Sequence, residues 1–106
     1  MLEVVLSETA QNELESAHHW WATNRSREQA DQWYNGFLTV MLRLESSPER
    51  YAVAPENDDF PLEIRQLNYG VGRTSTHRAV FTIRANRVII LRVRHLAQEP
   101  LAAGDD

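Results

Sequence analysis

Apolar positions recur at two different spacings along this chain, and each change of spacing marks a new element. Residues 2–6 form a short β-favouring run. From there to about residue 24, and again from residue 27 until shortly before Pro48, apolar residues recur every three or four positions, as on one face of a helix. Residues 62–68, 77–83 and 88–95 are β-branched and aliphatic runs. The pattern predicts the order β-α-α-β-β-β.

Two serines mark where the predicted helices begin. Ser7 is followed by Glu8, an acid in the first turn where the helix dipole favours it. Ser26 is followed three residues later by Gln29, the spacing of a capping box. Because only a residue or two separates the helices, they are predicted to form an antiparallel hairpin.

The elements together predict one α+β domain over residues 1–106, with the helix hairpin packed on one face of a small antiparallel sheet. The opposite sheet face is expected to lie open. Residues 47–61 carry three prolines and four acids and are predicted to be a solvated loop. Residues 69–76 contain two glycines and predict a mobile turn, and residues 97–106 lack periodicity and predict a flexible tail.

The register of the last two strands decides which side chains meet the helices. A two-residue loop at 85–86 pairs Arg84 with Arg87 and mixes charged and apolar residues on both faces. A three-residue loop at 85–87 pairs Arg84 with Val88 and makes the helix-facing side entirely apolar. We therefore predict the three-residue loop. The residues then expected to face the helices are Ala79, Phe81, Ile83, Ile89, Leu91 and Val93, and those expected to be buried there are Phe37, Leu44, Phe81 and Leu91.

Composition limits the kind of protein. The 106 residues are 42% hydrophobic and include no cysteine, which excludes a disulfide or a thiolate metal site. The N-terminal stretch has neither the length nor the charge pattern of a signal peptide or membrane span, so a cytoplasmic protein without membrane contact is expected. All eleven basic residues are arginine, which keeps its charge and grips phosphate or carboxylate in a planar fork.

Charge is unevenly distributed along the chain. The net charge is −4, yet residues 1–61 hold eleven acids and four arginines, whereas residues 62–98 hold one acid and seven arginines. This asymmetry predicts one basic surface on an otherwise acidic molecule. In the chosen register, Arg78, Arg92 and Arg94 cluster on the open sheet face. The cluster is either an anion site for a phosphodiester or partner carboxylate, or a solvated face whose long side chains cover the sheet.

Three other features suggest chemistry. His95 ends the last strand, opposite His77, and is either a general acid or base or a strand-end residue without a task. The run His-His-Trp-Trp at 18–21 suggests a metal or nucleic-acid site, but neighbouring helical side chains point about 100° apart, which favours a packing role. The acids of residues 56–59 are expected to be solvated rather than metal ligands.

The element order and the segments EIRQLNYG, HRAVFTI and VIILRVRH resemble the RelE/ParE superfamily of toxins from bacterial type II toxin–antitoxin systems, over nearly all of residues 2–96. The resemblance implies a plasmid-stabilisation type toxin that needs no cofactor or metal and is neutralised by a cognate antitoxin. We expect an acidic, partly disordered antitoxin to dock on the open cationic face and around the helix pair.

The resemblance also implies candidate site residues. Arg78 matches the arginine that opens the third strand in RelE-like members, Arg92 or Arg94 matches the phosphate-gripping arginine of the last strand, and His95 resembles a terminal histidine. These four are the candidate catalytic residues. The candidates for contact with RNA or a partner protein are Arg65, Arg73 and Arg84.

Three hypotheses remain open. A RelE-like toxin would be a metal-independent endoribonuclease that cuts mRNA on the ribosome and so inhibits translation. A ParE-like toxin would inhibit DNA gyrase without being an enzyme. A degenerate member would keep the fold and bind only an antitoxin.

Overall fold

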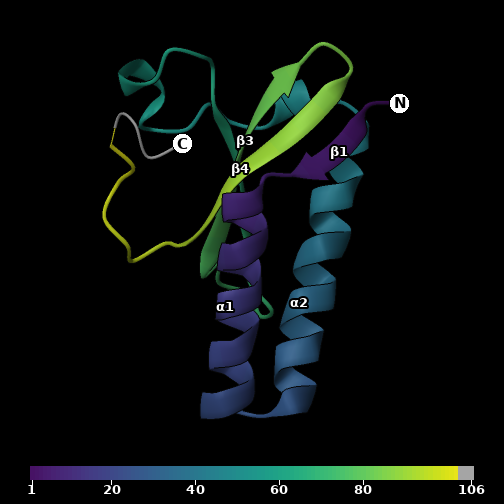
Figure 1. The fold of residues 1–106 in the computed structure, drawn as a ribbon, viewed down its shortest axis with the longest axis vertical. Coiled ribbons are helices and arrows are strands. Elements are labelled where there is room, and N and C mark those ends of the chain that lie inside the picture. The colour runs from purple at the N-terminus through teal and green to yellow at the C-terminus, as the bar shows by residue number, and fades with distance from the viewer. Residues whose placement is uncertain (103–106) are drawn as a thin grey trace.

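The fold agrees with the predicted class and element order. The computed structural model describes residues 1–102, in which two antiparallel helices lie side by side against one face of a four-stranded sheet (Figure 1). The elements are β1 Glu3–Leu6, α1 Glu8–Asn24, α2 Arg27–Leu42, β2 Arg65–Tyr69, β3 His77–Arg84 and β4 Arg87–His95. Short 3₁₀ turns at Arg43–Glu45, Pro48–Arg50 and Asn57–Asp59 lie between α2 and β2.

The two helix starts lie where the serines predicted them. The Ser7 hydroxyl accepts the Ala10 N–H at 3.0 Å, and the Ser26 hydroxyl accepts the Gln29 N–H at 3.0 Å. Each bond satisfies a backbone donor that the first helical turn leaves unpaired. The chain leaves the helical conformation before Pro48, where Ser47 adopts a left-handed φ of 52°. The predicted helix hairpin is therefore confirmed.

The strand order is β1-β4-β3-β2, and β1 runs parallel to β4, so the sheet is mixed rather than wholly antiparallel. The pairing of β1 with β4 ends at Leu6, opposite Ile90. Beyond this point the outer edge of β4 continues to His95 with no strand of the described residues beside it, and α1 lies along this stretch instead. This free edge becomes one wall of the site described below.

The predicted three-residue loop between β3 and β4 is wrong near the turn and correct at the far end. Arg84 pairs with Arg87, as a two-residue loop requires, and a β-bulge then lies between Val80 and Phe81. Beyond the bulge His77 faces His95, as the three-residue loop predicted. An extra residue on one strand shifts the pairing by one. The chain thus uses both registers.

The bulge exchanges the side chains that meet the helices. Val88 and Ile90 are fully buried in the helix-facing core, whereas Ile89 and Leu91 are only half-buried. Leu91 packs against a second cluster instead, so its predicted place under the helices is wrong. Phe37, Leu44 and Phe81 are buried as predicted. The helix-facing core comprises Ala10, Leu14, Trp33, Phe37, Met41, Leu44, Leu67, Ala79, Phe81, Val88, Ile90 and Val93.

The turn itself is strained at one residue. Ala85 has a φ of 53°, a conformation that costs a residue with a Cβ about 1–2 kcal/mol. We expect Ala85→Gly to raise the free energy of unfolding by about 0.5–1 kcal/mol, because glycine removes this strain but adds freedom to the unfolded chain. Urea denaturation would measure the gain. Asn86→Gly is the control, since Asn86 has no positive φ and should gain nothing; equal gains would contradict the explanation.

The sheet face expected to be open is covered. Ala54 and Ile64, from the segment between α2 and β2, pack with Val80 and Leu101 into a second buried cluster. Figure 1 shows this segment and the chain after β4 on the side of the sheet away from the helices. Leu101 is 3% exposed, so the predicted flexible tail includes a buried residue, and its last four residues lie outside the described part. An antitoxin cannot dock on this face as expected without displacing that cover.

Candidate functional site

Arg78, the first candidate catalytic residue, is buried in an internal ion pair. Its side chain is 9% exposed and forms two bonds with the Glu56 carboxylate, while Nη1 also donates to the Gln66 Oε1 at 2.7 Å. Glu56 in turn accepts the Leu101 N–H at 2.9 Å. The bonds from Arg78 hold the pKa of Glu56 at about 2, well below its ordinary value. The predicted solvated position of Glu56 is wrong.

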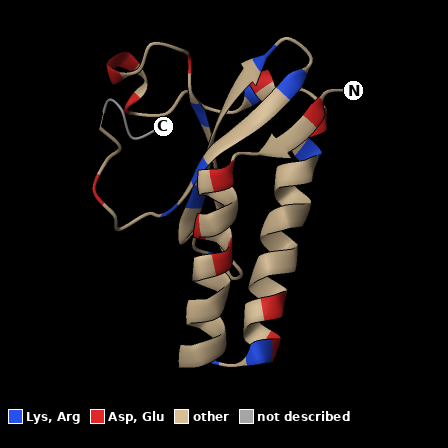
Figure 2. Cartoon of the chain, in the orientation of Figure 1, with Lys and Arg blue, Asp and Glu red and all other residues tan. Residues whose placement is uncertain are grey.

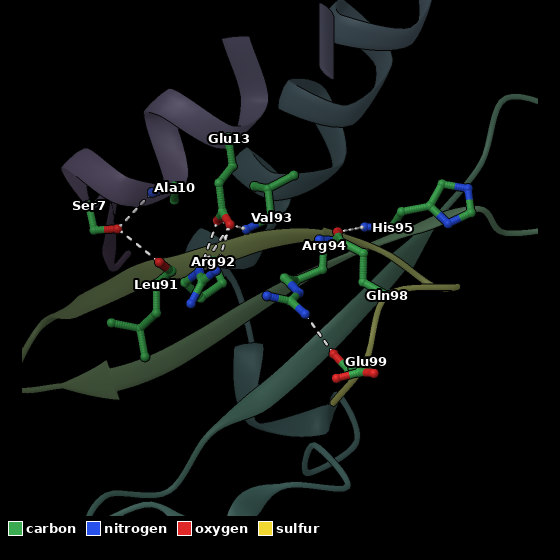
Figure 3. A network of polar contacts seen from close by, with 10 residues as sticks. All are labelled: Ser7, Ala10, Glu13, Leu91, Arg92, Val93, Arg94, His95, Gln98 and Glu99. Carbon is green, nitrogen blue, oxygen red and sulfur yellow. Dashed lines mark hydrogen bonds and ion pairs between the residues drawn. The ribbon is translucent and has the colours of Figure 1, made fainter. Parts of the chain in front are cut away.

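Arg92 is held by a carboxylate from α1. Its Nε donates to the two Glu13 oxygens at 3.0 and 3.1 Å, and Nη2 donates to Oε2 at 2.8 Å. Glu13 also accepts the backbone N–H of Val93 at 2.9 Å. Figure 3 shows Glu13 reaching from α1 onto β4 at this point. The pair fastens α1 to the strand edge that β1 leaves unpaired.

The side chains of Arg94 and His95 have different surroundings and do not form one site. The Arg94 guanidinium donates to the backbone carbonyl of Glu99 at 2.6 Å. His95 lies on the helix side opposite His77, and its ring points away from Arg92 and Arg94 in Figure 3. Arg78 and Arg94 are cross-strand partners and Arg92 shares their sheet face, as the predicted register requires. The face is not open as predicted, because Glu56, Glu13 and the Glu99 carbonyl hold the three guanidinium groups, and His95 lies on the other face.

The remaining candidates divide into one structural residue and two exposed ones. Arg65 donates to the carbonyls of Glu49 and Tyr51, at 2.8 and 2.6 Å, and pairs with Glu63, so it anchors the connecting segment to β2. Arg73 and Arg84 are exposed. Within residues 1–102 no ion pair involves either of them. Their role in binding a partner stays a prediction.

Folding pairs three arginines of the basic half of the chain with acids of the acidic half, so the predicted basic surface loses part of its charge. Glu3, Glu13 and Glu56 come from the acidic half and pair with arginines of the basic half. Arg87, Arg92 and Arg78 are their respective partners. Figure 2 shows acidic residues on α1 and β1 and arginines on the strands beside them. Part of the charge asymmetry in the sequence therefore becomes ion pairs between the two halves of the folded chain.

A groove of about 730 Å³ runs between α1 and the free edge of β4. Ala17, Trp20 and Trp21 give it an apolar wall, and Trp20 is 51% exposed. A large apolar side chain left in water beside a groove is typical of a surface that a partner covers. The other lining residues are Thr9, Asn12, Glu13, Ser16, Arg25, Thr76, His77, Val93, His95 and Gln98. Sequence reasoning missed this groove, although the two tryptophans were the available signal.

Two histidines, His77 and His95, line the groove side by side. The rings of His77 and His95 are 4.9 Å apart between centroids, and His77 also packs on Trp33 at 4.9 Å. The Ala97 N–H donates to Nδ1 of His95, so the neutral ring carries its proton on Nε2. That nitrogen can donate a hydrogen bond but cannot ligate a metal ion while the bond to Ala97 persists.

Burial, with a smaller contribution from the neighbouring His95, lowers the pKa of His77 from 6.5 to about 4. The unfolded chain takes up this proton near its ordinary pKa of 6.5, whereas the folded chain does not, so stability falls as the pH drops through this interval. We expect a loss of about 2–3 kcal/mol between pH 6.5 and 4.5. Urea denaturation at both pH values should show it in the wild type and not in His77→Phe. Equal losses in the two proteins would contradict this assignment.

The other features singled out in the sequence have packing roles. His18 contacts Asp31 at 2.8 Å and joins α1 to α2, and Trp21 packs against the core. Within residues 1–102 no cluster of three or more histidine, cysteine or acidic side chains could hold a metal ion. No helix in that range combines the length and apolar character needed to cross a bilayer.

Comparison with known proteins identifies the family to which the chain is similar. The model of a family described as the ParE toxin of the type II toxin–antitoxin system parDE matches residues 4–100. A solved structure described as the chromosomal ParDE TA system from P. aeruginosa is similar in fold, with a TM-score of 0.72 and 17% sequence identity. The likeness covers 90% of this chain and 96% of that one. No curated protein matches the chain.

Proposed function

Because this chain belongs to the ParE toxin family of type II toxin–antitoxin systems, we propose that it arrests growth by binding DNA gyrase, without cleaving RNA. The observation that carries the proposal is that two of the candidate arginines are already held in ion pairs within the chain. A nuclease must present charged groups to a phosphate in one open site. Here Arg78 and Arg92 are already paired with Glu56 and Glu13.

The position of His95 on the other side of the sheet also argues against a nuclease site. A general acid must lie within hydrogen-bond reach of the atom that it protonates. His95 lies in the groove on the helix side, whereas Arg78 lies under the covering segment on the opposite side. No single phosphate could contact both residues in this arrangement. The endoribonuclease hypothesis therefore has less support than a toxin that acts by binding.

The groove beside α1 is our candidate docking place for the cognate antitoxin. It replaces the sheet face expected from the sequence, which the chain itself covers. Its wall of Ala17, Trp20 and Trp21 suits the apolar side of an amphipathic segment, and Arg25 at its rim suits acidic residues. A partner seated there would bury the exposed part of Trp20.

Two assays on one preparation test the proposed mode of action. Purified toxin is added to a gyrase supercoiling reaction and, separately, to a translation reaction in which cleavage of ribosome-bound mRNA is mapped. We expect inhibition of supercoiling, no new mRNA ends, and relief of inhibition when the antitoxin encoded beside the toxin gene is added first. Cleavage of mRNA would overturn the proposal. Growth arrest without either effect would exclude gyrase as the target, and absence of growth arrest would leave only antitoxin binding.

A further inference from the structure

Two neighbouring residues of β4 beside the groove form a binding site for a carboxylate, which Glu13 fills in the free chain. Arg92 and the backbone N–H of Val93 are neighbours on β4, and together they donate four hydrogen bonds of 2.8–3.1 Å to the two Glu13 oxygens (Figure 3). The guanidinium fork matches any carboxylate, whichever chain supplies it. The receiving groups belong to β4, whereas the carboxylate that fills them comes from α1.

The site lies on the part of the β4 edge where side chains, rather than a neighbouring strand, hydrogen-bond to the backbone. Beyond Ile90, the Ser7 hydroxyl donates to the Leu91 backbone carbonyl, and the side-chain Oε1 of Gln98 accepts the His95 N–H. Glu13 completes the same edge at Val93. Such contacts can be exchanged for those of another chain without breaking a strand pair, because no strand within residues 1–102 occupies this edge.

Charge indicates which kind of group could replace Glu13. Glu13 and Val93 line the groove and Arg92 lies next to them, so a segment seated in the groove lies beside the carboxylate site. Among the described residues that line the groove, Glu13 is the one acid, and it is neutralised by Arg92, while Arg25 adds positive charge. Glu13 itself remains 22% exposed. The groove therefore favours an apolar segment that carries a carboxylate.

We propose that an Asp or Glu side chain of the antitoxin displaces Glu13 from Arg92 and the Val93 N–H when the antitoxin occupies the groove. The identity of the partner rests on the proposed function. Burial of the apolar groove wall supplies the free energy that brings the two carboxylates into competition. Glu13 acts as an internal competitor, which keeps Arg92 paired in the free toxin and lowers the affinity of partners that lack a suitable acid.

Acetate tests the binding site without any partner protein. In Glu13→Ala the vacated groups should bind acetate, so acetate should saturably shift the Val93 amide resonance and raise the melting temperature relative to equal sodium chloride. Wild type should show neither effect. Glu15→Ala is the matched control, because Glu15 is on the same helix but bonds to Gln11. A folded Glu13→Ala without a Val93 shift, or the same response in Glu15→Ala, would overturn the proposal. Should Glu13→Ala not fold, Glu13→Ser, whose short side chain also vacates the site, serves in its place.

Antitoxin binding tests the exchange itself. Loss of the internal competitor should make Glu13→Ala bind the antitoxin about tenfold more tightly, and Arg92→Gln should bind about tenfold more weakly. Glu15→Ala should bind like the wild type. Unchanged or weaker binding by Glu13→Ala would refute the exchange. The outcome is independent of the gyrase assay, because a toxin that cleaves mRNA could still bind its antitoxin in this way.

Discussion

Arg78→Ala should lower the free energy of unfolding by about 3–5 kcal/mol, the usual result of removing one partner from a buried ion pair. The substitution leaves the Glu56 carboxylate, which is 6% exposed, without the guanidinium that neutralises it. The Leu101 N–H then bonds to an uncompensated charge. Urea denaturation at pH 7, followed by tryptophan fluorescence, would measure the loss.

Two variants separate this effect from a general loss of charge. Arg84→Ala removes the same side chain from an exposed position and should change stability by less than about 0.5 kcal/mol. Arg78→Met combined with Glu56→Leu removes both charges and should recover most of the stability, because packed apolar side chains can replace a buried pair. Equal stability of Arg78→Ala and Arg84→Ala would contradict the structural role.

Acid provides a second readout of the same pair. The pKa of Glu56 is lowered from 4.5 to about 2 by Arg78, so the pair contributes stability above pH 4.5 that is lost as the pH falls toward 2. Arg78→Ala should lack this acid-dependent loss. It follows that a non-toxic Arg78→Ala is not by itself a sign of catalysis, since misfolding alone would abolish growth arrest.

The sequence predicted the helices well because their signals are local. Ser7 and Ser26 cap helices whose apolar stripes lie within the same segment, so neither depends on distant residues. The strand register failed for a physical reason. Residues 88–91 are four consecutive apolar residues, so alternation alone does not decide which of them face the helices. The bulge lets the turn end of the hairpin follow the two-residue-loop register and the far end follow the three-residue-loop register.

The site was harder to predict because its contacts are long-range. Arg92 and Glu13 are 79 positions apart, and Arg78 and Glu56 are 22 apart. The sequence identified the arginines but not the acids that form ion pairs with them. One signal was available for the covered face, since Ala54, Phe60 and Leu62 flank the acidic run and pack in the second cluster. An exposed loop has little need for apolar residues at these positions.

The second large effect concerns the bulged strand and compares two neighbouring isoleucines. Ile90 is fully buried in the helix-facing core, opposite Phe81, whereas Ile89 is half-buried on the other face. Ile90→Ala should destabilise the fold by about 2–5 kcal/mol, because it removes buried methyl groups and leaves a cavity. Ile89→Ala should cost clearly less, and urea denaturation of both variants measures the difference. The continuous three-residue-loop register predicts the reverse order, with Ile89 as the buried residue. A larger loss for Ile89→Ala would therefore show that the bulge is misplaced and that the register expected from the sequence extends to the turn.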